Sequence, residues 1–197
     1  MRKGKVILDK GKFELTLKRL SFELIENHGD FSETCIIGIQ ERGVLLADRI
    51  TEIVKQNSKK AKYKYGKLDI TFYRDDFRRR DNPLSPSKTE IDFLIEDKRV
   101  ILIDDVLYTG RTIHAAMSAL MDFGRPRQVE LLTLVNRRFN RHLPIKADYA
   151  GINVDALDDA YVRVDWDDDA AKNKVLFFAG DKNNRESCTS NLVPSTY

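Results

Sequence analysis

Two adjacent carboxylates, Asp104 and Asp105, are the side chains of this sequence best arranged for chemistry. They follow the apolar run 100–103 and precede residues 109–112, where a glycine flanked by hydroxyl groups leads directly into a helical pattern. A glycine-centred turn at a helix N-terminus presents backbone N–H groups to a phosphate. Paired carboxylates accept hydrogen bonds only, so they suit a sugar diol or a magnesium-bound sugar. The stretch predicts a ribose 5-phosphate site. The alternative is a strand end with solvated aspartates and an ordinary turn, and it is disfavoured because all the expected features occur in the right order within thirteen residues.

The sequence on either side of the acid pair predicts a strand–helix–strand unit. Residues 100–103 form an unbroken apolar run, which is typical of a strand buried on both faces of a parallel sheet. Apolar residues at helical spacing follow from Ile113 to Met121, and a second apolar run spans 129–135. The crossover should be right-handed, so the helix N-terminus should lie beside the carboxyl end of a central strand.

The strand–loop–helix pattern recurs elsewhere in the chain, and one long polar segment, predicted to be a loop, lies between these units. Residues 75–98 combine an arginine run at 78–80 with several prolines and serines. A loop of this length in a compact domain is usually functional or disordered. The remaining patterns predict strands at 6–8, 34–39 and 62–74, helices at 13–28 and 44–55, and a terminal hairpin at 161–166 and 174–178.

Residues 100–112 resemble the phosphoribosyl-pyrophosphate signature of type I phosphoribosyltransferases. The wording DDVLYTGRT is most similar to the PyrR family, pyrimidine operon attenuators that also have uracil phosphoribosyltransferase activity. The resemblance implies an α/β fold, with a mostly parallel central sheet flanked by helices, a flexible hood loop at about 75–98 and a C-terminal β-hairpin. The expected domain covers 1–179, and the polar residues 180–197 are expected to form a flexible tail. Further similar motifs are GIQERG at 38–43, LDITFYRDD at 68–76, FGRP at 123–126 and LPIKADYAG at 143–151.

The resemblance also implies a role for each part of the site. Asp104 and Asp105 would fix the ribose hydroxyls and hold Mg²⁺ indirectly, through the ribose or water. Arg42 would stabilise the leaving pyrophosphate electrostatically. The alternative is that Arg42 is an exposed arginine in a turn without a role in binding. The 5′-phosphate would be bound by Val106, Leu107, Tyr108, Thr109, Gly110, Arg111 and Thr112. The pyrophosphate would be bound by Gln40, Glu41, Arg42, Gly43 and Arg74.

The base-facing part of the chain departs from the family pattern. The resemblance places the nucleobase, expected to be uracil, at Val135, Asn136 and Arg137. The family's usual Asp-Arg reads Asn136-Arg137 here, and its Ile-Pro-Thr-Ser stretch reads Val-Asp-Ala-Leu at 154–157.

A nucleotide-sensing RNA-binding regulator of pyrimidine biosynthesis genes is the alternative function. RNA binding needs a coherent basic surface, which the resemblance places on the first helix and on residues 139–153. Phe22, Asn140 and Ile152 stand where the family tends to carry basic groups, so we expect weakened RNA binding. A receiver-type domain would also use paired acids, but it carries them early in the chain, and here the pair lies in mid-chain. Basic character on the expected RNA surface remains at Lys18, Arg19, Arg141 and Lys146.

Composition is that of one soluble globular domain. Charged residues make up 33% of the 197 residues and the net charge is only +3, which gives little support to a dedicated nucleic-acid binder. Two cysteines suggest a reducing compartment, and no apolar stretch approaches the ~20 residues of a membrane helix. The sequence therefore predicts a cytoplasmic protein without membrane association. The resemblance implies phosphoribosyl pyrophosphate, uracil, UMP or UTP and leader RNA as partners, and a homo-oligomer, dimer or higher.

Overall fold

The computed structural model describes residues 4–75, 87–139, 141–156, 160–167 and 172–180. Most of the arginine-rich part of the predicted hood and nearly all of the predicted tail lie outside these residues. The proposed division into 1–179 and 180–197 therefore stays a prediction.

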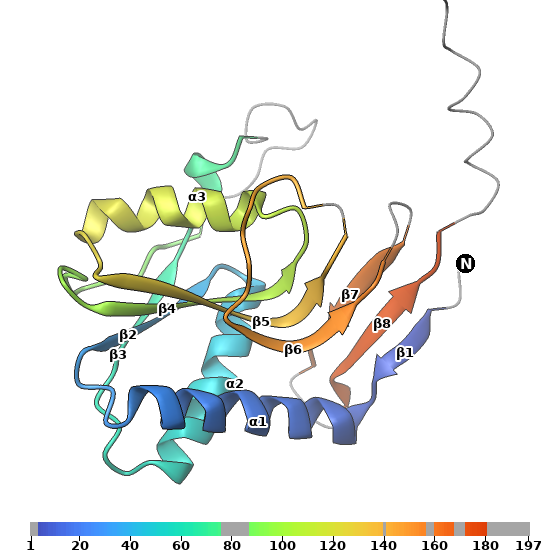
Figure 1. Ribbon diagram of the computed structural model, residues 1–197, viewed down its shortest axis with the longest axis horizontal. Coiled ribbons are helices and arrows are strands. Elements are labelled where there is room, and N and C mark those ends of the chain that lie inside the picture. Colours follow the sequence, from blue (N-terminus) through green and yellow to red (C-terminus); the bar gives the residue numbers. More distant parts are fainter. Residues whose placement is uncertain (1–3, 76–86, 140, 157–159, 168–171, 181–197) are drawn as a thin grey trace, which may run out of the picture.

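A five-stranded parallel sheet forms the centre of the molecule, with strand order β3-β2-β4-β5-β6 (Figure 1). Its helices lie on both faces, with α1 and α2 below and α3 above in the view of Figure 1. This architecture confirms the predicted α/β fold. The strands are β2 Thr34–Ile39, β3 Lys64–Leu68, β4 Arg99–Leu107, β5 Gln128–Arg137 and β6 Tyr149–Val154, and the helices are α1 Lys10–His28, α2 Arg42–Asn57 and α3 Arg111–Leu120.

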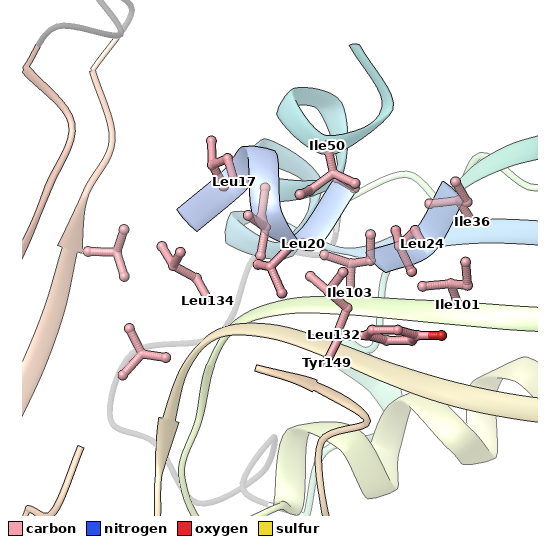
Figure 2. Packing of buried hydrophobic residues seen from close by; sticks show 14 of the residues in the cluster. Leu17, Leu20, Leu24, Ile36, Ile50, Ile101, Ile103, Leu132, Leu134 and Tyr149 are labelled. Carbon is pink, nitrogen blue, oxygen red and sulfur yellow. The ribbon is translucent and has the colours of Figure 1, made fainter. Parts of the chain in front are cut away.

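Strand β4 divides the hydrophobic core between the two faces of the sheet. Successive side chains of a strand point to opposite faces, so Ile101 and Ile103 pack with α1 and α2 while Val100 and Leu102 pack with α3. Figure 2 shows the first of these clusters, where leucines of α1 meet Ile50 of α2 above β4 and β5. Burial on both faces is the reason that the strand reads as an unbroken apolar run.

A smaller antiparallel sheet, in the order β1-β8-β7, flanks the parallel one. The predicted terminal hairpin is confirmed as β7 Tyr161–Asp165 and β8 Lys174–Phe178. Strand β1, Lys5–Leu8, pairs with β8 from the far end of the chain. Trp166 follows β7 and meets Phe13 of α1 edge to face at 5.4 Å between ring centroids, which ties this sheet to the main body.

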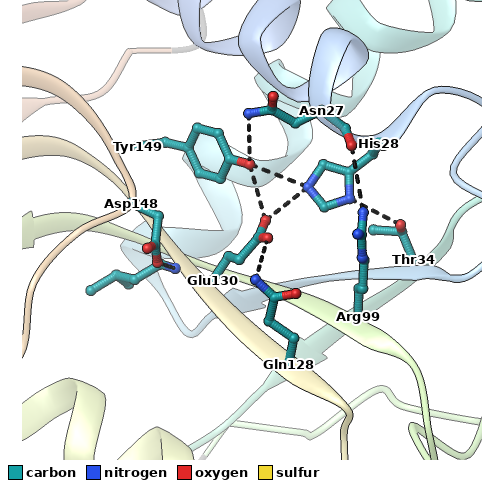
Figure 3. A network of polar contacts seen from close by, with 9 residues as sticks. Asn27, His28, Thr34, Arg99, Gln128, Glu130, Asp148 and Tyr149 are labelled. Carbon is teal, nitrogen blue, oxygen red and sulfur yellow. Dashed lines mark hydrogen bonds and ion pairs between the residues drawn. The ribbon is translucent and has the colours of Figure 1, made fainter.

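A buried polar network joins α1 to the amino ends of the central strands (Figure 3). His28 lies 2.8 Å from Glu130 through Nε2 and 3.1 Å from Thr34 through Nδ1. The Tyr149 hydroxyl donates to the same Glu130 oxygen at 3.0 Å and accepts from Asn27 at 3.1 Å. Burial lowers the pKa of His28, and the Glu130 carboxylate opposes this. The network lies at the opposite end of the strands from the acid pair.

The strands differ from the sequence prediction in three ways. The strand expected over 62–74 ends at Leu68, because Asp69 Oδ1 accepts from the Thr71 N–H at 2.9 Å and starts a turn, Thr71–Tyr73. Strands β4 and β5 run further than their apolar cores, to Leu107 and Arg137. Strand β6 was not predicted. None of the helices in the described residues has the length and apolar character needed to span a membrane.

Candidate functional site

The acid pair lies within β4 rather than beyond its end. Asp104 and Asp105 are only 8% and 6% exposed, and the Asp105 N–H donates to Asp104 Oδ1 at 3.0 Å. Strand alternation turns the two side chains apart. Asp104 lines a hollow together with Thr112 at the start of α3, whereas Asp105 Oδ2 lies 3.6 Å from Arg42 Nη1 at the start of α2.

The N-terminus of α3 forms one side of this hollow. Gly110 adopts a left-handed conformation with φ +90°, which glycine tolerates best, and the chain enters the helix at Arg111. The N-cap is Gly110, which has no side chain to cap the helix, and Thr109 Oγ1 accepts from the Arg111 N–H at 3.4 Å. Residues 106–112 line a cavity of about 380 Å³ together with Arg74 and Asp104. Uncapped helix N–H groups beside an arginine are suited to a phosphate.

The N-terminus of α2 approaches the acid pair from the other side. Gly43 permits this contact, since a Cβ atom there would lie 2.3 Å from the Ile103 carbonyl oxygen. A second cavity of about 570 Å³ adjoins the first and shares Arg74 and Asp104 with it. It is lined by Gln40, Glu41 and Arg42, by both aspartates and by further residues of 69–71 and 87. Both strand–loop–helix units therefore converge on one pair of carboxylates.

Burial governs the ionisation of the pair. It raises the pKa of Asp104 to about 8, the neighbouring Asp105 charge adds to the rise, and Arg74 and Arg42 oppose it. Burial also raises the pKa of Asp105, against the influence of Arg42 and of the Trp166 indole. Removing a carboxylate from water disfavours its charged form, so a cation placed at the pair would favour ionisation.

The pair fits a magnesium ion that takes its remaining ligands from elsewhere. Asp105 Oδ2 is buried and accepts no hydrogen bond within the described part of the chain. The same residues contain no group of three or more His, Cys, Asp or Glu side chains that could hold a metal ion. Mg²⁺ is commonly held by one or two carboxylates, with substrate oxygens and water completing its shell.

The predicted base-binding residues lie at the carboxyl end of β5. Val135 is buried, and Asn136 donates from Nδ2 to Asn153 Oδ1 of β6 at 2.9 Å. Arg137 is only 4% exposed and extends toward the interior, where its guanidinium lies 3.6 Å from the Tyr108 ring centroid. The structure thus places Arg137 against the loop 106–112.

The predicted RNA-binding residues divide into two pairs. Lys18 and Lys146 are exposed. Arg19 is also exposed, and its guanidinium donates to the Ala150 and Gly151 carbonyls of β6, at 2.8 and 2.7 Å. Arg141 donates to the carbonyl of Tyr108 in the loop 106–112. Asn140 lies outside the described residues.

Sequence reasoning missed two neighbours of the site. Trp166, the single tryptophan of the chain, lies near Asp105. The backbone N–H groups of His142 and Leu143 donate to the Thr109 carbonyl at 3.0 and 3.2 Å, so the segment 141–145 covers the loop 106–112. The motif at 143–151 was the available signal for this segment, whereas nothing local to Trp166 indicated its position.

Comparison with known proteins agrees with this fold. Residues 4–169 match the family model described as "Phosphoribosyl transferase domain". A curated relative from Caldicellulosiruptor bescii, "Bifunctional protein PyrR", is 43% identical over 176 residues, which are 89% of this chain and 96% of the relative. A relative with the same printed name from Enterococcus faecalis is 39% identical over 178 residues, 90% of this chain and 98% of the relative.

A solved structure of a hypoxanthine-guanine phosphoribosyltransferase from Bacillus anthracis has a TM-score of 0.66 and 15% identity, covering 91% of this chain and 99% of that one. At this identity the likeness concerns the fold alone. Fold and site together define a type I phosphoribosyltransferase. Within that class, the chain belongs to the PyrR family.

Proposed function

We propose that this protein transfers ribose 5-phosphate from phosphoribosyl pyrophosphate to uracil, giving UMP and pyrophosphate. The observation that carries the proposal is the convergence of two helix N-termini on the buried pair Asp104 and Asp105. One helix start suits the 5′-phosphate, the other suits the pyrophosphate, and the carboxylates between them suit the ribose diol. These three chemistries occur in this order in phosphoribosyl pyrophosphate.

The roles of the side chains follow from this placement. The loop 106–112 holds the 5′-phosphate, and Gln40 to Gly43 with Arg74 hold the pyrophosphate. Arg42 also donates to the Val164 carbonyl at 3.2 Å, which fixes a permanent positive charge near the leaving group. Negative charge develops on pyrophosphate as it departs, so preorganised cations stabilise the transition state. Asp104 and Asp105 orient the ribose through its hydroxyls and transfer no proton in the reaction.

Magnesium is the proposed cofactor. Bound between the acid pair and the substrate, it would supply additional positive charge for the leaving pyrophosphate. Asp105 Oδ2 supports this assignment, since it is buried and accepts no hydrogen bond from the described residues, with Arg42 Nη1 at 3.6 Å as its ion-pair partner.

Uracil is the proposed base because the curated relatives are PyrR proteins. The test is pyrophosphate release with Mg²⁺ and each of uracil, orotate, adenine, hypoxanthine and guanine. We expect release with uracil, its loss in Asp105→Asn, and normal release in the matched control Glu14→Gln on the exposed side of α1. Activity with a purine and none with uracil would overturn the assignment.

A nucleotide-sensing RNA-binding regulator is the second candidate function, favoured by the word "bifunctional" in the names of the relatives. Exposed Lys18 and Lys146 support a basic surface, whereas Arg19 and Arg141 are engaged within the protein. We therefore expect weak, strongly salt-dependent binding to pyrimidine-operon leader RNA. A salt titration against an unrelated hairpin tests this, and tight leader-selective binding at physiological salt would contradict it.

We also propose a homo-oligomer, dimer or higher, in the cytoplasm. Light scattering of the purified full chain across a concentration series tests the assembly, and a monomer throughout would refute it.

A further inference from the structure

Two arginines hold Tyr108, the third residue of the loop 106–112, one through its ring and the other through its carbonyl. The Arg137 guanidinium lies 3.6 Å from the centroid of the Tyr108 ring, within the range of a cation–π contact. The Arg141 guanidinium donates through Nη1 to the Tyr108 carbonyl oxygen. The side chain and the backbone of the same residue are therefore both held.

The same arginines are anchored at the carboxyl end of β5. Arg141 Nη2 donates to Asn136 Oδ1 at 2.8 Å and to the Arg137 carbonyl at 3.1 Å. Arg137 Nη2 donates to the Ala160 carbonyl, just before β7, at 2.9 Å. A guanidinium is a planar, permanently charged fork of donors, so one side chain can join several acceptors in a fixed geometry. The loop, the end of β5 and the start of β7 are thus connected through two side chains.

These contacts reach the other end of the site only indirectly, through β7, where Arg42 donates to the Val164 carbonyl. The proposed pyrophosphate end is built on Gln40 to Gly43, at the start of α2 on the far side of β4. A change in the arginine contacts should therefore affect one end of the substrate and spare the other. This asymmetry distinguishes a local effect on the loop from a general loss of structure.

We propose that Arg137 and Arg141 are positioning residues for the 5′-phosphate: they fix Tyr108 so that the N–H groups at the start of α3 face the phosphate. The inference rests on the proposed function and deepens it. It assigns Arg137 to the phosphate loop instead of the nucleobase, and it gives Arg141 a role apart from RNA.

The test measures two ligands that occupy opposite ends of the site, ribose 5-phosphate and magnesium pyrophosphate, by calorimetry on the full chain. The variants are Arg137→Met, Arg141→Met and Arg141→Lys. The matched control is Arg127→Met, an exposed arginine next to the opposite end of β5. Melting temperatures and steady-state kinetics accompany each titration.

We expect the methionine variants to raise the Kd for ribose 5-phosphate about tenfold or more, the size typical of losing a hydrogen bond to a charged donor. The Kd for pyrophosphate should stay within about twofold, as for distant independent sites. In turnover, KM for phosphoribosyl pyrophosphate should rise more than kcat falls, because binding is weakened before the transition state. Arg141→Lys retains the charge but loses the forked guanidinium, so its Kd for ribose 5-phosphate should lie between those of the wild type and Arg141→Met.

An unchanged Kd for ribose 5-phosphate in both methionine variants would overturn the inference. Equal weakening of both ligands together with a lower melting temperature would overturn it too, since that result indicates a merely structural role. If a methionine variant does not fold, the ratio of the two affinities in Arg141→Lys decides. Failure of the wild type to bind ribose 5-phosphate would instead refute the proposed function itself.

Discussion

Asp104→Asn should make the ligand-free protein more stable at alkaline pH while removing its ability to use phosphoribosyl pyrophosphate. Burial and the neighbouring Asp105 raise the pKa of Asp104 from 3.8 to about 8. Between these two values the folded protein keeps a proton that the unfolded chain has released. The free energy of unfolding therefore falls as the pH rises through this range, and it is lowest above about pH 8. Asparagine has no charge to bury and can still accept from the Asp105 N–H.

The structure sets the size of this effect. Each tenfold change in proton affinity corresponds to about 1.4 kcal/mol, so the rise in the pKa of Asp104 from 3.8 to about 8 gives a ceiling of about 6 kcal/mol. Relaxation and water entry through the adjoining cavities reduce the cost of a buried charge. We therefore expect the free energy of unfolding of Asp104→Asn to exceed that of the wild type by about 2 kcal/mol at pH 9. The wild type gives up this stability at the acid pair in exchange for ligand binding.

Urea unfolding of both proteins from pH 5 to pH 9 measures the gap directly. The two stabilities should be similar at pH 5 and should separate progressively above it, with the variant the more stable. Glu14→Gln, which removes an exposed carboxylate, should follow the wild type throughout. A gap that is independent of pH, or a variant less stable than the wild type at pH 9, would refute the argument.

Three further changes test the packing and the polar networks. Gly43→Ala should lower the free energy of unfolding by about 3 kcal/mol, since the added Cβ would lie 2.3 Å from the Ile103 carbonyl oxygen; an unchanged melting temperature would contradict this contact. Burial lowers the pKa of His28, so acid destabilises the fold below about pH 6.5, and Glu130→Gln should steepen that loss by removing the opposing charge. If the free energy of unfolding in urea falls equally steeply from pH 7 to pH 5 in the wild type and in Glu130→Gln, this prediction is wrong. Arg19→Ala should cost about 1 kcal/mol and speed amide exchange in β6, because two carbonyls of that strand lose donors at 2.8 and 2.7 Å. Unaltered exchange would show that Arg19 does not stabilise this edge.

The features of this protein that depend on neighbouring residues could be predicted from its sequence. The apolar run before Asp104 predicts a doubly buried strand, and Gly110 predicts a turn into a helix, because strand periodicity and backbone freedom are local properties. The order of these features along thirteen residues predicts the site and resembles the family's signature. The comparisons confirm the family, while the roles of the site residues stay a prediction.

Only the tertiary structure decided which distant residues meet. The sequence could not show that β1 pairs with β8, since strand pairing depends on where two chain ends come together. Nor could it show that the polar end of β4 is buried, because the cover comes from both helix starts. The resemblance placed Arg137 at the nucleobase and Arg141 on the RNA surface, yet the fold brings both to Tyr108, some thirty residues earlier. A guanidinium on a long side chain can reach many partners, and packing alone selects which acceptor it finds.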